Sequence, residues 1–116
     1  MNQRWYDKYA SMSLAINILQ STSIANREKV VKAIQTQIRT QYPAVTLIVE
    51  SERRWLMKLF QKRRSLDASA WMMIENLKYL TDDQREEFAQ KIVDLVNHLE
   101  EQTAYEETVT EFLKII

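Results

Sequence analysis

The chain has 116 residues, with 16 basic and 16 acidic side chains, a single proline, and neither glycine nor cysteine. This length suits one domain over residues 1–116 with a core of its own, and the lack of cysteine excludes disulfides and thiolate metal sites. No stretch reaches the ~18 uncharged apolar residues that a membrane-spanning helix needs. Charges also interrupt the N-terminal region where a signal peptide would be apolar, so we expect a cytoplasmic protein.

The absence of glycine is the most informative feature of the composition, because average usage of about 7% would supply roughly eight glycines. Left-handed turns and tight hairpins are therefore scarce. A chain with almost no helix breakers and no hairpin signals is expected to be all-α. We predict a compact bundle of five to six short amphipathic helices, in which residues other than glycine end the helices.

An apolar stripe is predicted on the first helix by five residues spaced 4, 3, 4 and 3 apart: Trp5, Tyr9, Met12, Ile16 and Leu19. If the helix begins near Gln3, Trp5 and Tyr9 extend the core. If Ser11 or Ser13 caps a later start, the two aromatic residues lie in an arm folded over the core.

The segment RWYDKYASMSLAINIL resembles the start of small bacterial helical proteins of uncharacterised function, in which Arg-Trp-Tyr-Asp-Lys precedes a helix. The resemblance covers about the first 20 residues. It implies a bacterial, cytoplasmic, helical module and supplies no catalytic residue. Within this segment, Arg4, Tyr6 and Lys8 are the side chains that we expect to be available to a partner.

The next two helices are predicted on either side of the proline. One begins between Ser23 and Asn26, ends near Tyr42, and has a narrow apolar stripe. That stripe consists of Val30, Val31, Ile34 and Ile38. The other is expected over residues 46–64, although the β-branched run 45–49 is also typical of a short strand. Its apolar arc contains Ile48, Val49, Leu56, Leu59 and Phe60, with Trp55 at one edge.

A fourth helix is predicted to begin at a cap formed by Asp67 or Ser69. Its inward residues are Ala70, Met73, Ile74 and Leu77. A capping box of Thr81 and Gln84 marks the start of a fifth helix. That helix is expected to use Phe88, Ile92, Leu95, Val96 and Leu99 in the core.

A second capping box, Thr103 with Glu106, predicts a sixth and separate helix at the C-terminus. The apolar register slips between Leu99 and Tyr105, which also favours a break there. The apolar face of this last helix is expected to contain Val109, Phe112, Leu113 and Ile116.

Charge is distributed unevenly along the neutral chain. Residues 1–66 hold 12 lysines and arginines against four acidic residues, and residues 67–116 hold the reverse, giving +8 and −8. Such blocks can attract each other within one fold or across a dimer, and a basic block can also bind nucleic acid. The densest basic stretch is RRWLMKLFQKRR, with Arg53, Arg54, Lys58, Lys62, Arg63 and Arg64. We expect this patch to be solvated or to pair with the acidic half of the chain, with an external protein and then nucleic acid as the alternatives.

Four apolar residues lie away from the expected core faces and form a candidate partner interface. Leu14 and Ile18 lie opposite the stripe of the first helix, and Met72 and Tyr79 project together from the fourth. They either complete an irregular core or contact another chain. The second possibility predicts a homodimer, in which the basic half of one copy meets the acidic half of the other.

Catalytic chemistry has little support in this sequence. Phosphate-binding loops need glycine, and a zinc site needs several cysteine or histidine ligands, whereas the chain has one histidine. Asp94 precedes His98 by four residues and could orient it as a general base, but no marked nucleophile accompanies the pair. We therefore expect no cofactor, and a non-catalytic interaction or regulatory module. Nucleic-acid association is the alternative, and an Asp94/His98 hydrolase is a remote one.

Overall fold

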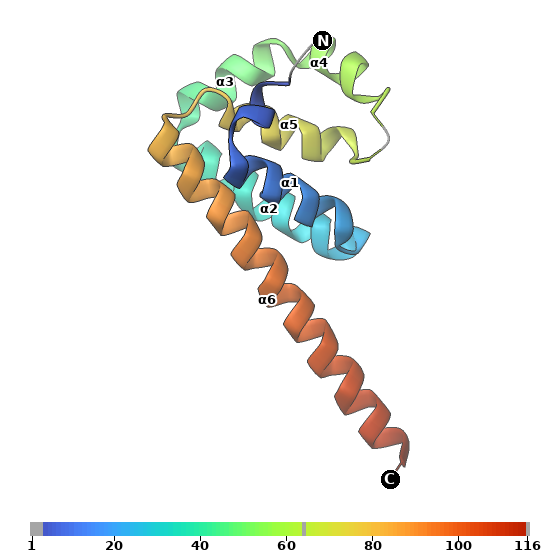
Figure 1. Cartoon of the computed structure of the whole chain (residues 1–116). Coiled ribbons are helices and arrows are strands. Elements are labelled where there is room, and N and C mark those ends of the chain that lie inside the picture. Colours follow the sequence, from blue (N-terminus) through green and yellow to red (C-terminus); the bar gives the residue numbers. More distant parts are fainter. Residues whose placement is uncertain (1–3, 64, 116) are drawn as a thin grey trace.

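The computed structural model describes residues 4–63 and 65–115, which form six α-helices and one 3-10 turn (Figure 1). In chain order these are η1 (Trp5–Lys8), α1 (Ala10–Ser21), α2 (Ile24–Gln41), α3 (Pro43–Ser51), α4 (Arg53–Phe60), α5 (Ala68–Leu77) and α6 (Asp82–Ile115). The described residues contain no strand, so the all-α prediction is confirmed.

The helices enclose one cluster of buried apolar side chains. The first half of α6 packs against α1 and α2, α2 also contacts α3 and α5, and α4 packs on α5. Trp71, Phe60 and Phe88 are among the largest fully buried side chains of this core. The second half of α6 continues beyond the bundle, away from the other helices (Figure 1).

The N-terminal segment differs from the single helix expected over the first stripe. Tyr9 has extended backbone angles, φ −117° and ψ 110°, so the 3-10 turn ends there and α1 begins at Ala10. Trp5 and Tyr9 still pack against the core. The expectation that Tyr6 is available to a partner is wrong, because only 4% of it is exposed. The tighter 3-10 turn changes which side chain faces inward.

The helix predicted over residues 46–64 is divided at Glu52 into α3 and α4, and no strand forms over 45–49. The backbone angles of Glu52, φ −102° and ψ 4°, interrupt the helix. A single helical wheel therefore cannot predict which residues of α3 and α4 face the core. Phe60 is buried as predicted, together with Val49 and Leu56. Trp55, by contrast, is 64% exposed, and Ile48 and Leu59 are also exposed.

The predicted caps at Asp67 and Thr81 are confirmed, and α2 begins within its predicted range with Ser23 as the cap. Ser23 accepts a hydrogen bond from the Asn26 backbone N–H at 3.1 Å, and Asp67 accepts one from the Ala70 N–H at 2.8 Å. At the start of α6, the Thr81 N–H donates to Gln84 Oε1 at 3.1 Å, and the Gln84 N–H donates to Thr81 Oγ1 at 3.2 Å. The apolar stripes predicted for α2 and α5 are buried as well.

The break predicted between Leu99 and Tyr105 is wrong, because α6 is one helix of 34 residues. Thr103 does not cap a new helix: its hydroxyl donates to the Leu99 carbonyl at 2.9 Å, one turn earlier. Threonine can form this bond inside a helix as well as capping one, and neither glycine nor proline interrupts the segment. The register slip therefore marks a change of apolar face along a continuous helix. Ile116 lies outside the described residues.

Arg27 satisfies backbone carbonyls at the C-terminal end of α1, where many other helices are closed by a glycine. It is the fourth residue of α2, and its guanidinium donates to three carbonyl oxygens. These are Leu19 at 2.8 Å, Gln20 at 3.1 Å and Thr22 at 3.4 Å, which lie eight, seven and five residues earlier.

Arg85 repeats this arrangement with the same spacing at the end of α5. It is the fourth residue of α6 and donates to the carbonyls of Leu77 at 3.0 Å, Lys78 at 3.1 Å and Leu80 at 2.8 Å. None of the described residues has a positive φ angle, so no left-handed cap occurs among them. At these two helix ends an arginine side chain supplies the donors instead, and we name each set of three bonds an arginine clasp.

The Arg85 clasp also joins the N-terminal turn to the bundle. Arg85 is 6% exposed, and its guanidinium carbon lies 4.4 Å from the ring centroid of Tyr9 and 5.6 Å from that of Trp5. Its Nη1 also donates to Asp82 at 2.7 Å. One side chain thus connects η1, the end of α5 and the start of α6, and so fixes the direction in which α6 leaves.

We predict that Arg85→Met lowers the free energy of unfolding by about 3 kcal/mol, because two buried carbonyls and one partly buried carbonyl lose a charged donor. Urea unfolding followed by circular dichroism measures this change. Arg54→Met is the matched control, because Arg54 is exposed and makes no such bonds within the described chain. Equal free energies of unfolding for the two variants would contradict the role of the clasp.

Candidate protein-interaction site

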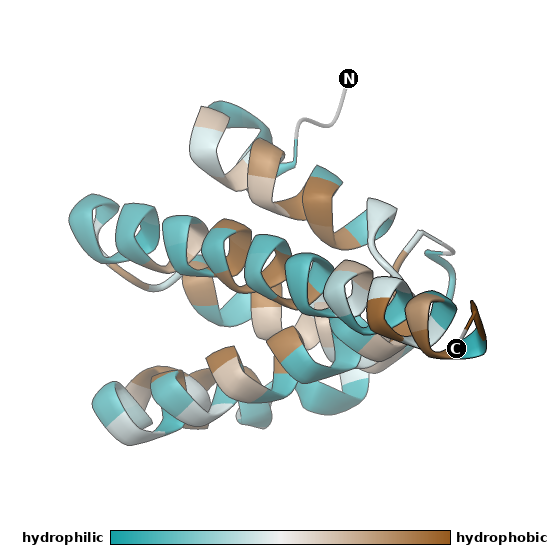
Figure 2. Ribbon diagram, turned by 90° about the horizontal axis from the view of Figure 1, so that it is seen from below, coloured by the Kyte–Doolittle hydropathy of each residue, from teal (hydrophilic) through white to brown (hydrophobic). Residues whose placement is uncertain are grey.

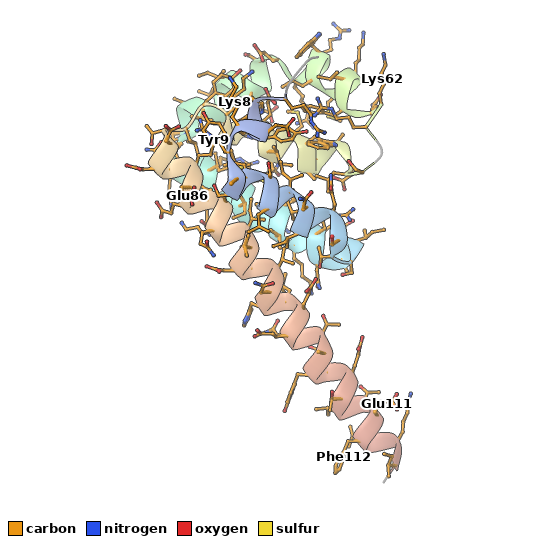
Figure 3. All side chains as sticks on the ribbon, viewed as in Figure 1. Lys8, Tyr9, Lys62, Glu86, Glu111 and Phe112 are labelled. Carbon is orange, nitrogen blue, oxygen red and sulfur yellow. The ribbon has the colours of Figure 1, made fainter. Side chains whose placement is uncertain are left out.

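The second half of α6 is a helix without a neighbour, and we name residues 100–115 the α6 arm. Every residue of the arm is exposed. The longest dimension of the molecule, 55 Å, is nearly twice the other two, 29 and 26 Å, because the arm extends beyond the bundle. Figure 3 shows Glu111 and Phe112 on the arm with no other element beside them.

An apolar stripe runs along one face of the α6 arm. Its members are Tyr105, Val109, Phe112 and Leu113, whose spacing places them on one side of the helix. Their exposed fractions lie between 37% and 71%. In Figure 2 this end of α6 carries apolar residues near the C-terminus. The arm also holds five glutamates and one lysine, so the stripe belongs to an acidic amphipathic helix.

A groove of about 360 Å³ lies at the other end of the molecule, between η1, α4 and the end of α5, and we name it the α4 groove. Its exposed or half-buried apolar wall consists of Trp5, Trp55, Leu59 and Tyr79. Its charged lining residues are Arg4, Glu52, Arg63, Glu75 and Lys78. The groove thus combines aromatic surface with charges of both signs.

Stacked aromatic rings support the floor of the α4 groove. The rings of Tyr6 and Trp71 stack with centroids 5.9 Å apart, and the Phe60 ring lies 6.2 Å from Trp71. The guanidinium of Arg63 lies over two of these rings, 4.8 Å from Trp71 and 5.2 Å from Phe60. These cation–π contacts hold Arg63 at the groove and leave its N–H donors for another group.

Three of the charged groups that line the groove are already in ion pairs. Arg4 pairs with Asp7 at 3.3 Å, and Lys78 pairs with Glu75 at 3.7 Å. Glu52 has no ion pair within the described part of the chain. It is the acidic group at the rim that opposes the nearby cations.

The predicted basic patch contributes Arg63 to the α4 groove, and Arg54 and Lys58 line a neighbouring hollow that shares Glu52 and Trp55 with it. Arg53 pairs with Glu50 at 3.2 Å, and Arg64 lies outside the described residues. The remaining cations of the patch have no ion pair among residues 4–63 and 65–115; they are Arg54, Lys58, Lys62 and Arg63. Cations without an ion pair therefore lie in the groove, at Arg63, and beside it, at Arg54 and Lys58, together with the unpaired Glu52.

The four residues predicted as a partner interface do not share one surface. Leu14 is 53% exposed on α1, whereas Ile18 is half-buried against the core. Met72 is only 4% exposed, so it belongs to the core and cannot contact a partner directly. Tyr79 lines the α4 groove.

Asp94 and His98 do not form the pair that a hydrolase would need. Both are exposed on α6, and Asp94 Oδ1 accepts a hydrogen bond from Gln90 Nε2 at 2.9 Å. No hydrogen bond between Asp94 and His98 occurs in the described chain. The same residues contain no cluster of three or more acidic, histidine or cysteine side chains placed to hold a metal ion.

Sequence patterns predict part of each candidate surface. They assign Val109, Phe112 and Leu113 to an apolar face and Tyr79 to a partner interface, but they do not include Tyr105, and they place Trp55 at the edge of a core arc. The register slip after Leu99 is the sequence feature that indicates the arm. In a continuous helix, an apolar face that shifts around the axis points away from the core that the first half of the helix contacts.

Comparisons with family models, curated proteins and solved structures give no match for this chain. Among the described helices, none combines the length and the apolar character needed to cross a membrane.

The buried hydroxyl of Tyr6, in the floor of the groove, has a raised pKa. Burial raises the pKa of its hydroxyl, and the positive charges of Arg4 and Arg63 oppose that rise. The hydroxyl is buried and has no hydrogen-bond partner in the described structure. Removing it therefore leaves no new unsatisfied group behind.

We predict that Tyr6→Phe changes the free energy of unfolding by less than about 1 kcal/mol at pH 7, because the deleted hydroxyl is unpaired. In the wild type, the unfolded chain ionises Tyr6 near its ordinary pKa of about 10 while the folded chain keeps the proton. Wild-type stability therefore falls, relative to Tyr6→Phe, as the pH rises above about 10. Urea unfolding of both proteins between about pH 8 and 11 measures the difference, and parallel profiles would contradict the raised pKa.

Proposed function

We propose that this protein is a non-catalytic, homodimeric interaction module, and that the α6 arm is the element through which it associates. The observation that carries the proposal is the exposure of every residue in the arm together with its apolar stripe. No cofactor and no reaction are part of this proposal.

The physical argument concerns the cost of leaving the stripe in water. Complete burial of a large apolar side chain contributes about 1.5–3 kcal/mol, and Tyr105, Val109, Phe112 and Leu113 lie side by side. Contiguous apolar surface of this kind is typical of interaction sites. Most helical stability in proteins comes from packing an amphipathic face, so contact with a partner would stabilise the arm.

The distribution of charge favours a second copy of this chain as the partner. The arm carries a net acidic charge, and the first 66 residues carry +8. The arm cannot reach its own basic surface, because α6 is continuous and leads away from α4. Figure 3 shows Lys62 and Phe112 at opposite ends of the molecule. A second copy supplies an oppositely charged surface without any other protein.

We predict that Val109→Gln combined with Phe112→Gln weakens self-association at least tenfold, which corresponds to about 1.4 kcal/mol. Glutamine preserves helix propensity but removes the apolar contacts. Sedimentation equilibrium over a range of protein concentrations gives the dissociation constants.

The matched control for this variant is Thr103→Gln combined with Thr110→Gln, which introduces the same side chains on the opposite face of the arm. This control is expected to dimerise like the wild type. A wild type that stays monomeric at high concentration, or equal weakening by the two double variants, would refute the proposal.

Single-stranded nucleic acid is a second candidate partner, favoured by the exposed indole of Trp55. This residue shares a small surface hollow with Arg54 and Lys58, an arrangement that permits base stacking beside phosphate contacts. Fluorescence anisotropy with labelled DNA and RNA oligonucleotides at several salt concentrations tests it. Binding that weakens with salt and is lost in Arg54→Gln/Lys58→Gln would support this candidate, and no binding at low salt would remove it.

A further inference from the structure

We infer that the α6 arm of each copy docks in the α4 groove of the other copy. This inference rests on the proposed self-association and names the surface that receives the arm. In each contact, the exposed apolar stripe of one copy packs in the exposed aromatic groove of the other copy.

The two surfaces are both apolar and both exposed. An amphipathic helix commonly binds by placing its apolar face in a groove, with anchor residues three, four and seven positions apart. Val109 and Phe112 follow Tyr105 by four and seven positions, and Leu113 follows Val109 by four. The groove offers Trp55, Leu59 and Tyr79 as exposed walls, with the aromatic stack beneath them.

The charges select this pairing over contact between two arms. In the arm, Glu111 pairs with Lys114 at 3.6 Å. The other glutamates have no ion pair within the described chain, and they are Glu100, Glu101, Glu106 and Glu107. Two arms side by side would bring these like charges together, whereas the groove holds the unpaired Arg63 and adjoins the unpaired Arg54 and Lys58.

Arg63 is the groove cation best placed to receive a carboxylate. It is held over Trp71 and Phe60 and has no ion pair in the described structure. In the arm, Glu101 precedes Tyr105 by four residues and Glu106 precedes Val109 by three, so both flank the apolar stripe. A guanidinium beside an apolar groove can therefore meet a carboxylate at the edge of the stripe.

Reciprocal docking closes the assembly. When each copy gives its arm and receives its partner's arm, the two contacts are related by a two-fold axis. No arm and no groove then remains free to add a third copy. The closed dimer buries the apolar stripes of both copies.

Complementation between two variants tests this arrangement. The arm variant, Val109→Gln/Phe112→Gln, keeps its groove, and the groove variant, Trp55→Gln/Leu59→Gln, keeps its arm. All four positions are exposed, so we expect circular dichroism spectra and thermal unfolding like those of the wild type. Leu47→Gln is the control for the groove variant, because Leu47 is exposed on α3 outside the groove.

We expect each double variant alone to associate at least tenfold more weakly than the wild type. An equimolar mixture should form a heterodimer, because the intact arm of one variant fits the intact groove of the other. Its dissociation constant should lie between those of the wild type and of either variant alone. Sedimentation velocity with a different fluorescent label on each variant detects the heterodimer, and Leu47→Gln should dimerise normally.

The other outcomes separate this inference from the proposed function. A groove variant that dimerises like the wild type, beside a monomeric arm variant, would overturn the docking in the groove and leave self-association through the arm intact. A mixture that stays monomeric would also overturn arm-to-groove docking. Wild-type behaviour by both variants, or a monomeric wild type, would overturn the inference and the proposed function together.

Discussion

The structure depends on how a chain without glycine closes its helices. The last carbonyls of a helix need donors, and glycine in a left-handed conformation is the common way to supply them. Here Arg27 and Arg85 reach back from the fourth position of the following helix and donate to the carbonyls at the preceding helix end. The same geometry at both sites sets how α1 leads into α2 and how α5 leads into α6.

The second of these clasps determines the shape of the molecule. Arg85 holds the first turn of α6 against the end of α5 and against Trp5 and Tyr9. Since α6 then continues without a break for 34 residues, its direction at the start fixes where its end lies. Phe112 follows the buried Ile92 by 20 residues, which at about 100° per residue places it on nearly the opposite side of the helix. A core-facing helix thereby becomes an exposed arm.

The arm and the groove give the unequal charge distribution a structural meaning. The unpaired glutamates lie on a helix that projects from the bundle, and the unpaired cations Arg54, Lys58 and Arg63 lie in or beside an aromatic groove at the other end. Attraction between them within one chain is prevented by distance and by the stiffness of α6. The association between copies that we propose would bring opposite charges and exposed apolar surfaces together at the same contact.

The sequence by itself determined the all-α class, the start of α2 between Ser23 and Asn26, the caps at Asp67 and Thr81, and the buried stripes of α2 and α5, because these depend on residues within one or two turns. Tertiary structure decided the features that involve more distant groups. Tyr6 is buried because Trp71 lies opposite it, and Trp55 is exposed because the chain bends at Glu52. Thr103 can cap a helix or bond within one, and the local sequence fits both. Periodicity identifies an apolar face but not its partner, so only the packed bundle shows that the face of the α6 arm has none within the described chain.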